Sequence, residues 1–281
     1  MRSRMRRAPA AARCGCAREP EAALRIGTNV WIGSEPLYLA RELGRLDPAA
    51  VQLVEYPSAS EVLRAYRNQA IDGMVISLDE LFGLAVDGLQ PRIILVVDVS
   101  HGADVVVGRR GMQTMRDLKG KSVAVESGAL GAFVLSRALA LNGMQASDVN
   151  VVHLESNEQP SAFEKGQVDG AVTFDPYRAQ FLRAGATTLF DSTQIPGEIV
   201  DLVAVRASVL EKQPKASTGA ARRLVRCDRL HEERSQGRGA THGNSPADDR
   251  RAVPGGPARA SMFRPARKIS GCSAARHRSW R

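Results

Sequence analysis

The stretch IDGMVIS at residues 71–77 recurs as VDGAVTF at residues 168–174, 97 positions further along the chain. Each copy places Asp-Gly before an apolar run, which is typical of a buried strand. A similar strand, loop and helix precede the two copies: LRIGTNVWIGSEPLYLARELG at 24–44 and KSVAVESGALGAFVLSRALALNG at 121–143. This approximate internal duplication predicts two similar α/β lobes.

Strands and helices alternate through the rest of the body, with short connections. Strands are expected at 24–28, 51–56, 71–77, 92–99, 103–108, 122–126, 149–154, 168–174, 188–191 and 199–206, and helices at 35–43, 58–68, 78–86, 129–142, 160–166 and 177–184. The continuous apolar runs at 92–99 and 103–108 indicate buried strands. This alternation predicts an α/β fold of parallel sheets flanked by helices. Loops at the carboxyl ends of such strands bind ligands, and two lobes can bring them together across a cleft.

Positive charge and cysteine are concentrated at the two ends of the chain. The whole chain has a formal net charge of +9, yet residues 24–215 hold 18 basic and 23 acidic residues. Nucleic acid is therefore not an expected partner of this body. All four cysteines also lie outside it, so neither a disulfide framework nor a thiolate metal site is expected there. No metal, cofactor or catalytic motif is predicted.

The head and the tail differ from the body in composition. The head carries positive charge but lacks the apolar stretch of a secretory signal. The tail has no apolar periodicity and is rich in Arg, Gly, Pro, Ser and Ala, which predicts disorder. A one-base shift can turn residues 223–242 into an amphipathic helix, so we interpret the tail as a frameshift product, which resequencing of the gene tests. The predicted organisation is a basic head (1–23), lobe I (24–101), lobe II (102–192), a return to lobe I (193–215) and a basic tail (216–281).

Candidate binding residues in the first repeat follow its predicted strands. Trp31 comes after the first strand, where it can form a wall of the cleft or pack in the core. Ser34 and Glu35 open the next helix, and Ser58 opens the helix after that. Backbone N–H groups and a hydroxyl at a helix start can hold an anion, but Ser and Glu there are also ordinary capping residues. Both readings stay open for these three residues.

Further candidates occupy comparable places in both repeats. Asp79 follows the third strand, and Asp175 follows its counterpart in the second repeat. These carboxylates can grip a cationic or hydrogen-bond-donating ligand, or they can cap helices. Ser127 and Gly128 lead from a strand into a long helix, where free N–H groups favour an anion or carboxylate; the alternative is a tight turn.

Short motifs along the body match a known family in order and spacing. They are NVWIGSEP (29–36), LARELG (39–44), IDG (71–73), SLDE (77–80), DVSHGAD (98–104), DLKGK (117–121), VESG (125–128), FDPY (174–177) and DSTQIPG (191–197). Over roughly residues 24–212 the chain resembles the solute-binding proteins of the nitrate/sulfonate/taurine and thiamine-pyrimidine type. Each motif alone is weak, and the departure lies in the tail, which does not supply the C-terminal helices that complete the first lobe in that family.

The resemblance implies a two-lobed periplasmic-binding-protein-like fold of type II, with a two-strand hinge near residues 97–103 and 191–201. It implies a non-enzymatic subunit of an ABC importer that captures a small-molecule ligand by hinge closure and delivers it to a permease. Ser100 and Asp104 bracket the expected hinge, and Gly102 between them can absorb the change in backbone angles. A monomer in the periplasm or cell envelope is expected, with a lipid anchor at Cys16 left open.

Two other classes of protein share this scaffold. A pyrimidine-precursor synthase-like enzyme requires a reactive His/Cys cluster, and the body has no Cys. A ligand-sensing regulatory domain requires a helix-turn-helix before residue 24, where there is too little chain. The sequence therefore favours solute binding, without indicating which solute.

Overall fold

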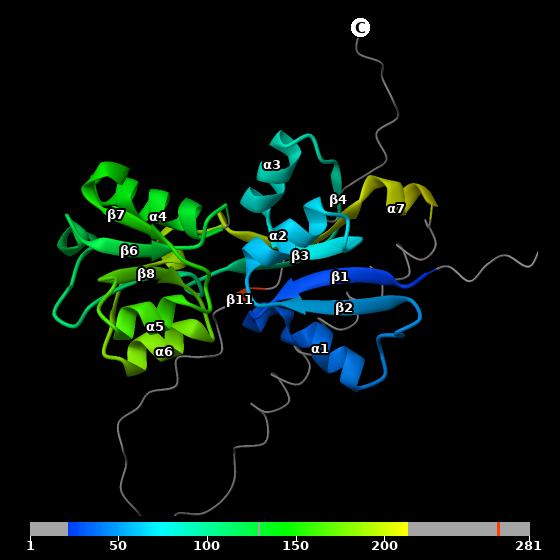
Figure 1. Ribbon diagram of the computed structural model, residues 1–281, viewed down its shortest axis with the longest axis horizontal. Helices are drawn as coiled ribbons and strands as arrows, with labels where there is room; N and C mark the ends of the chain where they lie inside the picture. Colours follow the sequence, from blue (N-terminus) through cyan, green and yellow to red (C-terminus); the bar gives the residue numbers. More distant parts are fainter. Residues whose placement is uncertain (1–21, 129, 213–262, 265–281) are drawn as a thin grey trace, which may run out of the picture.

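The computed structural model describes residues 22–128, 130–212 and 263–264, and these residues form two α/β lobes side by side (Figure 1). The first lobe is built on a six-stranded sheet of order β11-β4-β10-β3-β1-β2, and the second on a five-stranded sheet of order β7-β6-β8-β5-β9. The predicted head and most of the predicted tail lie outside the described residues, so those two predictions stay untested.

The first lobe takes its elements from two separate stretches of chain. Its strands are β1 (Leu24–Asn29), β2 (Val51–Tyr56), β3 (Gly73–Ser77), β4 (Pro91–Ser100), β10 (Val200–Arg206) and the short β11 (Phe263–Arg264). Its helices are the 3-10 turn η1 (Ile32–Ser34), α1 (Glu35–Glu42), α2 (Ala59–Arg67), α3 (Leu78–Val86) and α7 (Ala207–Lys212). Ser58 caps α2 as expected, because its hydroxyl accepts a hydrogen bond from the Glu61 N–H at 3.3 Å.

The second lobe is continuous in sequence. Its strands are β5 (Val105–Gly108), β6 (Ser122–Val125), β7 (Asn150–His153), β8 (Gly170–Thr173) and β9 (Thr187–Asp191). Its helices are α4 (Leu130–Leu141), α5 (Gln159–Glu164) and α6 (Tyr177–Arg183), with 3-10 turns η2 (Met115–Leu118) and η3 (Ala146–Asp148); a further turn, η4 (Ser192–Gln194), follows β9. Every element expected from the sequence is present, with bounds that differ by one or two residues at most ends.

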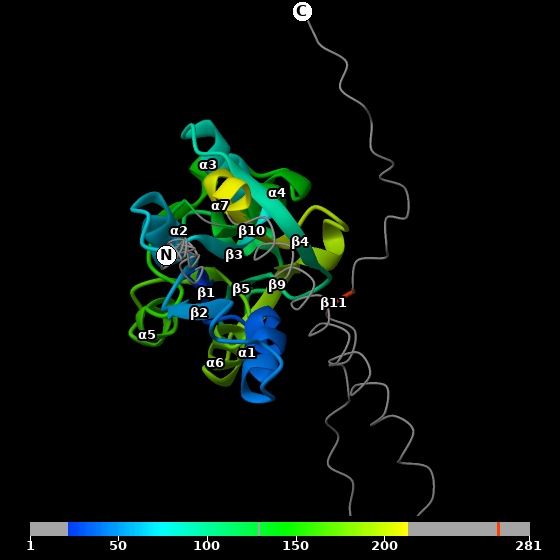
Figure 2. The ribbon, with the colours of Figure 1, turned by 90° about the vertical axis from the view of Figure 1, so that its right-hand side faces the viewer.

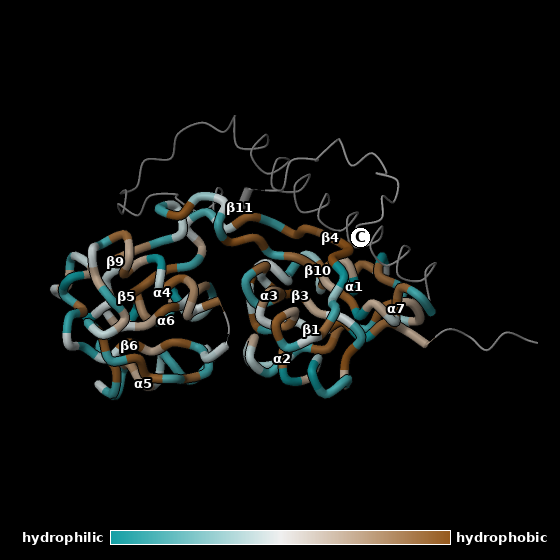
Figure 3. The backbone as a smooth tube through the Cα atoms, turned by 90° about the horizontal axis from the view of Figure 1, so that it is seen from above, coloured by the Kyte–Doolittle hydropathy of each residue, from teal (hydrophilic) through white to brown (hydrophobic). Residues whose placement is uncertain are grey.

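Each sheet is covered by apolar side chains on both faces. In β10 and β3, Val203 and Val75 pack toward α1, whereas Leu202 and Met74 pack toward α2 and α3, as the alternation of a strand requires. Helices α1, α5 and α6 lie on one side of the molecule, and α3 and α4 on the opposite side (Figures 1 and 2). Figure 3 shows the apolar segments running along the strands inside each lobe.

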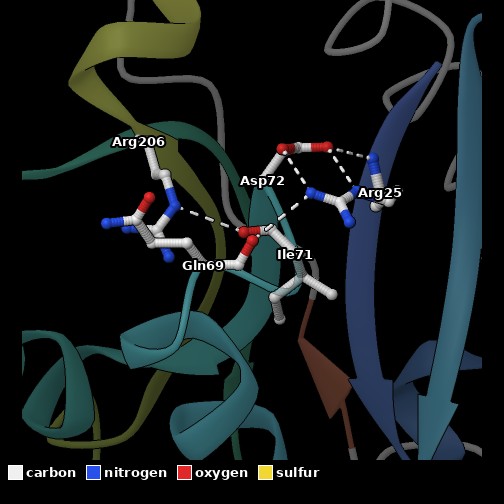
Figure 4. A network of polar contacts seen from close by, with 5 residues as sticks. All are labelled: Arg25, Gln69, Ile71, Asp72 and Arg206. Carbon is white, nitrogen blue, oxygen red and sulfur yellow. Dashed lines mark hydrogen bonds and ion pairs between the residues drawn. The ribbon is translucent and has the colours of Figure 1, made fainter. Parts of the chain in front are cut away.

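The internal duplication extends to single hydrogen bonds. Asp72 accepts from the Arg25 backbone N–H at 2.9 Å, and Asp169 accepts from the Ser122 N–H at 3.1 Å. The partners in both bonds are offset by 97 residues, as in the sequence repeat. Arg25 adds side-chain bonds of 3.1 and 3.2 Å to the Asp72 carboxylate (Figure 4). We call the Asp-Gly pair that precedes β3 or β8 the Asp-Gly corner. In each lobe its Asp is hydrogen-bonded to the start of the neighbouring parallel strand, β1 or β6.

In each lobe an arginine at the end of the neighbouring antiparallel strand donates hydrogen bonds to backbone carbonyls next to this corner. Arg206 donates to the carbonyl of Ile71 at 3.2 Å (Figure 4). It also donates to the Tyr66 carbonyl and lies 4.0 Å above the Tyr66 ring. Arg109 does the same in the second lobe: it donates to the carbonyls of Val168 and Phe163 at 2.6 and 2.9 Å and lies 4.6 Å above the Phe163 ring. The two arginines end β10 and follow β5, the strands that lie antiparallel beside β3 and β8.

The structure differs from the sequence expectation in two respects. The sheets are mixed: β1, β2 and β3 are parallel, as are β6, β7 and β8, but β10, β4, β5 and β9 pair antiparallel. The run at 92–99 is also less buried than predicted, since Ile93 is 48% and Val96 38% exposed. Its strand, β4, pairs along its length with β10 and only at Val99 and Ser100 with β11, so apolar sequence there does not bring full burial.

Gly73→Ala tests the close approach of β10 to β3. A Cβ at Gly73 would lie 2.6 Å from the Ala204 carbonyl oxygen, a backbone atom that cannot rotate away. The variant is expected to lose about 2 kcal/mol of unfolding free energy, measured by urea denaturation. Gly83→Ala in α3 is the matched control, because a Cβ there meets nothing within 4 Å and replaces a helical glycine. Equal urea midpoints for both variants would contradict the account.

Candidate functional site

Two adjoining cavities lie where the lobes meet, and they share five lining residues: Ala59, Glu80, Asp104, Leu130 and Phe174. The first is completed by Glu126, Gly131, Val134, Ser156, Val172 and Thr173, and the second by Asn29, Trp31, Val75, Ile76, Ser77 and Asp201. We call the two together the interlobe cleft. Its walls come from both lobes, so its shape depends on how the lobes are placed.

The chain crosses between the lobes twice, after β4 and before β10. At these crossings the Ser100 hydroxyl donates to Asp104 at 2.6 Å and lies 2.8 Å from the Ser192 hydroxyl, which in turn accepts from the Gly102 N–H at 2.7 Å. Gly102 has φ of +84°, a left-handed conformation that glycine adopts without strain. The buried hydroxyls therefore join the two crossings to each other, and Asp104 extends from them into the cleft.

Two glutamates bridge the lobes in opposite directions. Glu80 of α3 accepts from the Leu130 N–H of α4 at 3.2 Å and from its own lobe's Ser77 N–H at 2.9 Å. Glu126, which follows β6, accepts from the Ser60 N–H of α2 at 2.6 Å and from the Ser156 hydroxyl. Each carboxylate thus fills the first turn of a helix in the other lobe, where free N–H groups attract negative charge. The bonds to Leu130 and Ser60 join the two lobes across the cleft.

The cleft is acidic, and its acids are buried. Burial, reinforced by the charge of Asp79, raises the pKa of the Glu80 carboxyl to about 7. Burial raises the pKa of Asp104 to about 6, although the hydrogen bond from Ser100 opposes the shift. Burial and the neighbouring Asp98 raise the pKa of Asp201 well above its ordinary value. These carboxyls therefore lose their protons at a higher pH than exposed carboxyls do.

The predicted site residues fall into two groups. Trp31 and Asp104 line the cleft, while Ser100 belongs to the hydrogen-bonded hinge. The other seven do not line the cleft: Ser34, Glu35, Ser58, Asp79, Ser127, Gly128 and Asp175. Asp79 accepts from the Ser77 hydroxyl at 2.7 Å in the first turn of α3, and the Ser127 carbonyl accepts from the Ser60 hydroxyl at 3.0 Å. Any binding role for this second group stays a prediction.

Sequence reasoning missed several residues that the fold brings into the cleft. Glu80 and Phe174 are direct neighbours of the predicted Asp79 and Asp175, and Glu126 precedes Ser127, so the strand-end signal was correct to within one residue. Asp201 lies inside β10 opposite Asp98 of β4, where a carboxylate in an apolar strand was itself a usable signal. Ser156 and Thr173 left no such signal.

Two features are absent from the described part of the chain. None of its groups of three or more His, Cys, Asp or Glu side chains has an arrangement that can hold a metal ion. None of its helices combines the length and apolar character needed to cross a bilayer.

The fold is that of periplasmic solute-binding proteins. The alkanesulfonate-binding protein SsuA from Xanthomonas axonopodis pv. citri bound to MOPS superposes with a TM-score of 0.67 at 23% identity, covering 78% of each chain. The periplasmic aliphatic sulphonate binding protein SsuA from Escherichia coli gives 0.64 at 25% identity, covering 77% of this chain and 76% of that one. Residues 17–241 match the NMT1-like family, and the chain belongs to that family.

Among curated proteins, relatives named for sulfonate binding match part of the chain. An aliphatic sulfonates-binding protein of Escherichia coli K12 is 30% identical over 193 residues, which are 63% of this chain and 56% of the relative. A protein of the same name from Bacillus subtilis 168 is 30% identical over 215 residues, 68% of this chain and 60% of the relative. The chain thus spans less than two thirds of the length of these relatives, all named as binding proteins rather than enzymes.

Glu80→Gln tests the buried charge through the pH dependence of stability. The folded pKa of about 7 exceeds the ordinary 4.5, so the folded state keeps a proton that the unfolded state loses between these values. The unfolding free energy of the parent protein should therefore fall as pH rises through that interval. Gln keeps the acceptor oxygen but cannot ionise, so its stability relative to the parent should rise by up to roughly 3 kcal/mol between about pH 5 and about pH 8.

Urea denaturation at both pH values measures the difference, with Glu42→Gln on the exposed side of α1 as the control. If the stability of Glu80→Gln relative to the parent protein does not change with pH, the raised pKa of the Glu80 carboxyl is wrong.

Proposed function

We propose that this chain is the solute-binding component of an ABC-type importer. It captures a small molecule in the interlobe cleft by hinge closure and delivers it to a membrane permease. The observation that carries the proposal is the cleft itself: buried polar groups from two lobes face each other across a space bounded by two chain crossings. In this proposal residues 24–101 and 193–215 form one moving body and residues 102–192 the other.

The closed contacts support capture by lobe movement. Apart from the two crossings, the polar contacts between the described parts of the lobes are those of Glu80 and Glu126 and a few bonds such as the 3.4 Å contact from the Tyr177 hydroxyl to the Pro57 carbonyl. Val30 adds an apolar contact with the core of the second lobe. Such sparse polar contacts cost little to break, because each exchanges one hydrogen bond for another with water. Rotation about the crossings would open the cleft without unfolding either core.

The lining of the cleft favours binding over catalysis. Of the described lining residues, none is Cys or His, the residues of the reactive cluster that a pyrimidine-precursor synthase-like enzyme requires. A pyrimidine-precursor synthase-like enzyme therefore gains no support from this site. We propose further that the protein acts as a monomer. We also propose that it works in the periplasm, the compartment in the name of the related taurine-binding periplasmic protein of Escherichia coli.

Trp31 provides a direct test because it lines the cleft. The sequence has two tryptophans, so Trp280→Phe leaves Trp31 as the single indole reporter. Titration with a panel of sulfonates, taurine, nitrate, amines and pyrimidines should give a saturable fluorescence change with at least one compound. That compound should also raise the melting temperature.

Trp31→Ala should weaken binding of that compound by about tenfold or more in calorimetry, because a cleft wall is lost. Phe82→Ala is the matched control, since Phe82 is a large apolar residue of α3 that is 60% exposed. Equal losses in both variants, or none in either, would count against the interlobe cleft as the binding site.

A further inference from the structure

The charge of the interlobe cleft indicates what kind of solute it takes. Four carboxyl side chains line it, Glu80, Asp104, Glu126 and Asp201, and each is buried. Among the described lining residues none is Arg, Lys or His, so no basic side chain of the lining balances them. Buried carboxylates without a cationic partner are costly, and this cost is removed when a cation occupies the space between them.

A second feature of the cleft also calls for a ligand. Thr173 is 2% exposed, lines the first cavity, and its hydroxyl has no hydrogen-bond partner among the described residues. A buried hydroxyl without a partner costs free energy that a bound donor or acceptor would recover. Trp31 and Phe174 add aromatic surface to the second cavity, and aromatic faces attract organic cations.

An anion such as a sulfonate fits this cleft poorly. It would need the free N–H groups of helix first turns, but the Ser60 N–H is bonded to Glu126 at 2.6 Å and the Leu130 N–H to Glu80 at 3.2 Å. A sulfonate would have to displace both carboxylates and would leave them buried beside its own charge. The site is likewise unsuited to a bare metal ion, because the described acidic residues are not grouped to coordinate one.

We propose that the solute is a small organic cation, an ammonium, amidinium or guanidinium compound, whose N–H groups bond to Glu80, Asp104, Asp201 and Thr173. The proposal rests on the solute-binding function above and departs from the sulfonates for which the relatives are named. Closure brings the acids of the two lobes around the ligand, so the positive charge replaces the protons that the empty cleft holds. Cation binding is then coupled to proton release.

The surroundings of Glu80 set the expected pH dependence. Asp79 lies on its own helix, Asp98 and Asp201 on the adjoining strands, and Asp104 at the crossing, so the charges around it are negative. Arg178 is a basic side chain near the crossing, where it donates to the Gly102 carbonyl at 2.9 Å, and His101 lies in the crossing itself. As Glu80 and Asp104 ionise, the affinity for a cation should increase by about tenfold between about pH 5.5 and about pH 7.5.

Matched probes separate charge from shape. Benzamidinium, benzamide and benzenesulfonate share one ring and differ in charge, and butylammonium and butanesulfonate make a second, aliphatic pair. Titration calorimetry of the full chain in two buffers of different ionisation enthalpy measures affinity and proton release together. Benzamidinium or butylammonium should bind with release of protons, and the matching sulfonate should bind at least about tenfold more weakly.

Variants that replace one carboxyl by a neutral amide test which acids bind the cation. Glu80→Gln and Asp201→Asn should each weaken binding of the cation by about tenfold or more and flatten its pH dependence. Glu42→Gln, on the exposed side of α1, should change neither. Circular dichroism of each variant establishes that it is folded before titration.

The outcomes distinguish this inference from the function on which it rests. Binding of a sulfonate in preference to its matched cation overturns the inference and leaves solute capture intact. Binding of a cation that Glu80→Gln and Asp201→Asn leave unchanged also overturns it. If neither class binds, the inference fails, and the proposed function fails with it should the Trp31 fluorescence stay unchanged with every compound of the wider panel.

Discussion

Both lobes depend on a close backbone contact at an Asp-Gly corner. Gly73 lies against the Ala204 carbonyl and Gly170 against the Val107 carbonyl, and a Cβ at either position would come within 2.7 Å of the oxygen. Because glycine has no Cβ, an antiparallel strand, β10 or β5, can lie close beside the last of the parallel strands at this point. The chain passes from β4 into β5 and from β9 into β10, so these antiparallel strands lead directly into the two crossings between the lobes. The contact therefore makes a hinged pair of lobes possible.

The crossings bring a set of acids into the space between the lobes. Asp104 follows the first crossing, and Asp201 lies near the start of β10. Glu80 and Glu126 accept hydrogen bonds from helices of the opposite lobe. Burial raises the pKa of three of these acids. In the proposed mechanism an open cleft exposes these groups to water, so closure without a ligand costs free energy and a ligand that satisfies the acids favours closure.

Much of the fold follows from the sequence, because strands and helices in the repeat carry clear local signals. The 97-residue offset of IDG and VDG predicted two lobes, and it extends to the Arg25 and Ser122 backbone bonds that the sequence could not show. The antiparallel strands were not predictable from apolar pattern alone, since strand direction depends on which neighbour each strand meets. The arginines that stack on Tyr66 and Phe163 depend on that pairing too.

The site was only partly predictable for a similar reason. The ends of parallel strands predicted Trp31, and the position of the expected hinge predicted Asp104; both residues line the cleft. Which of two adjacent residues turns inward depends on the exact end of the strand, so Asp79 was chosen where Glu80 enters the cleft. Asp201 comes from a later part of the chain, and its signal in the sequence was a carboxylate within an otherwise apolar strand.

Hinge closure on a solute is the central claim, and the distance between the lobes tests it most directly. Spin labels on cysteines at Val86 of α3 and Leu141 of α4, which are 87% and 52% exposed, report across the cleft once the four natural cysteines are replaced by serine. Pulsed electron resonance should give a broad, longer distance distribution for the free protein. A saturating amount of the compound that changes Trp31 fluorescence should give one shorter, narrow distribution. Identical distributions with and without that compound would contradict capture by closure.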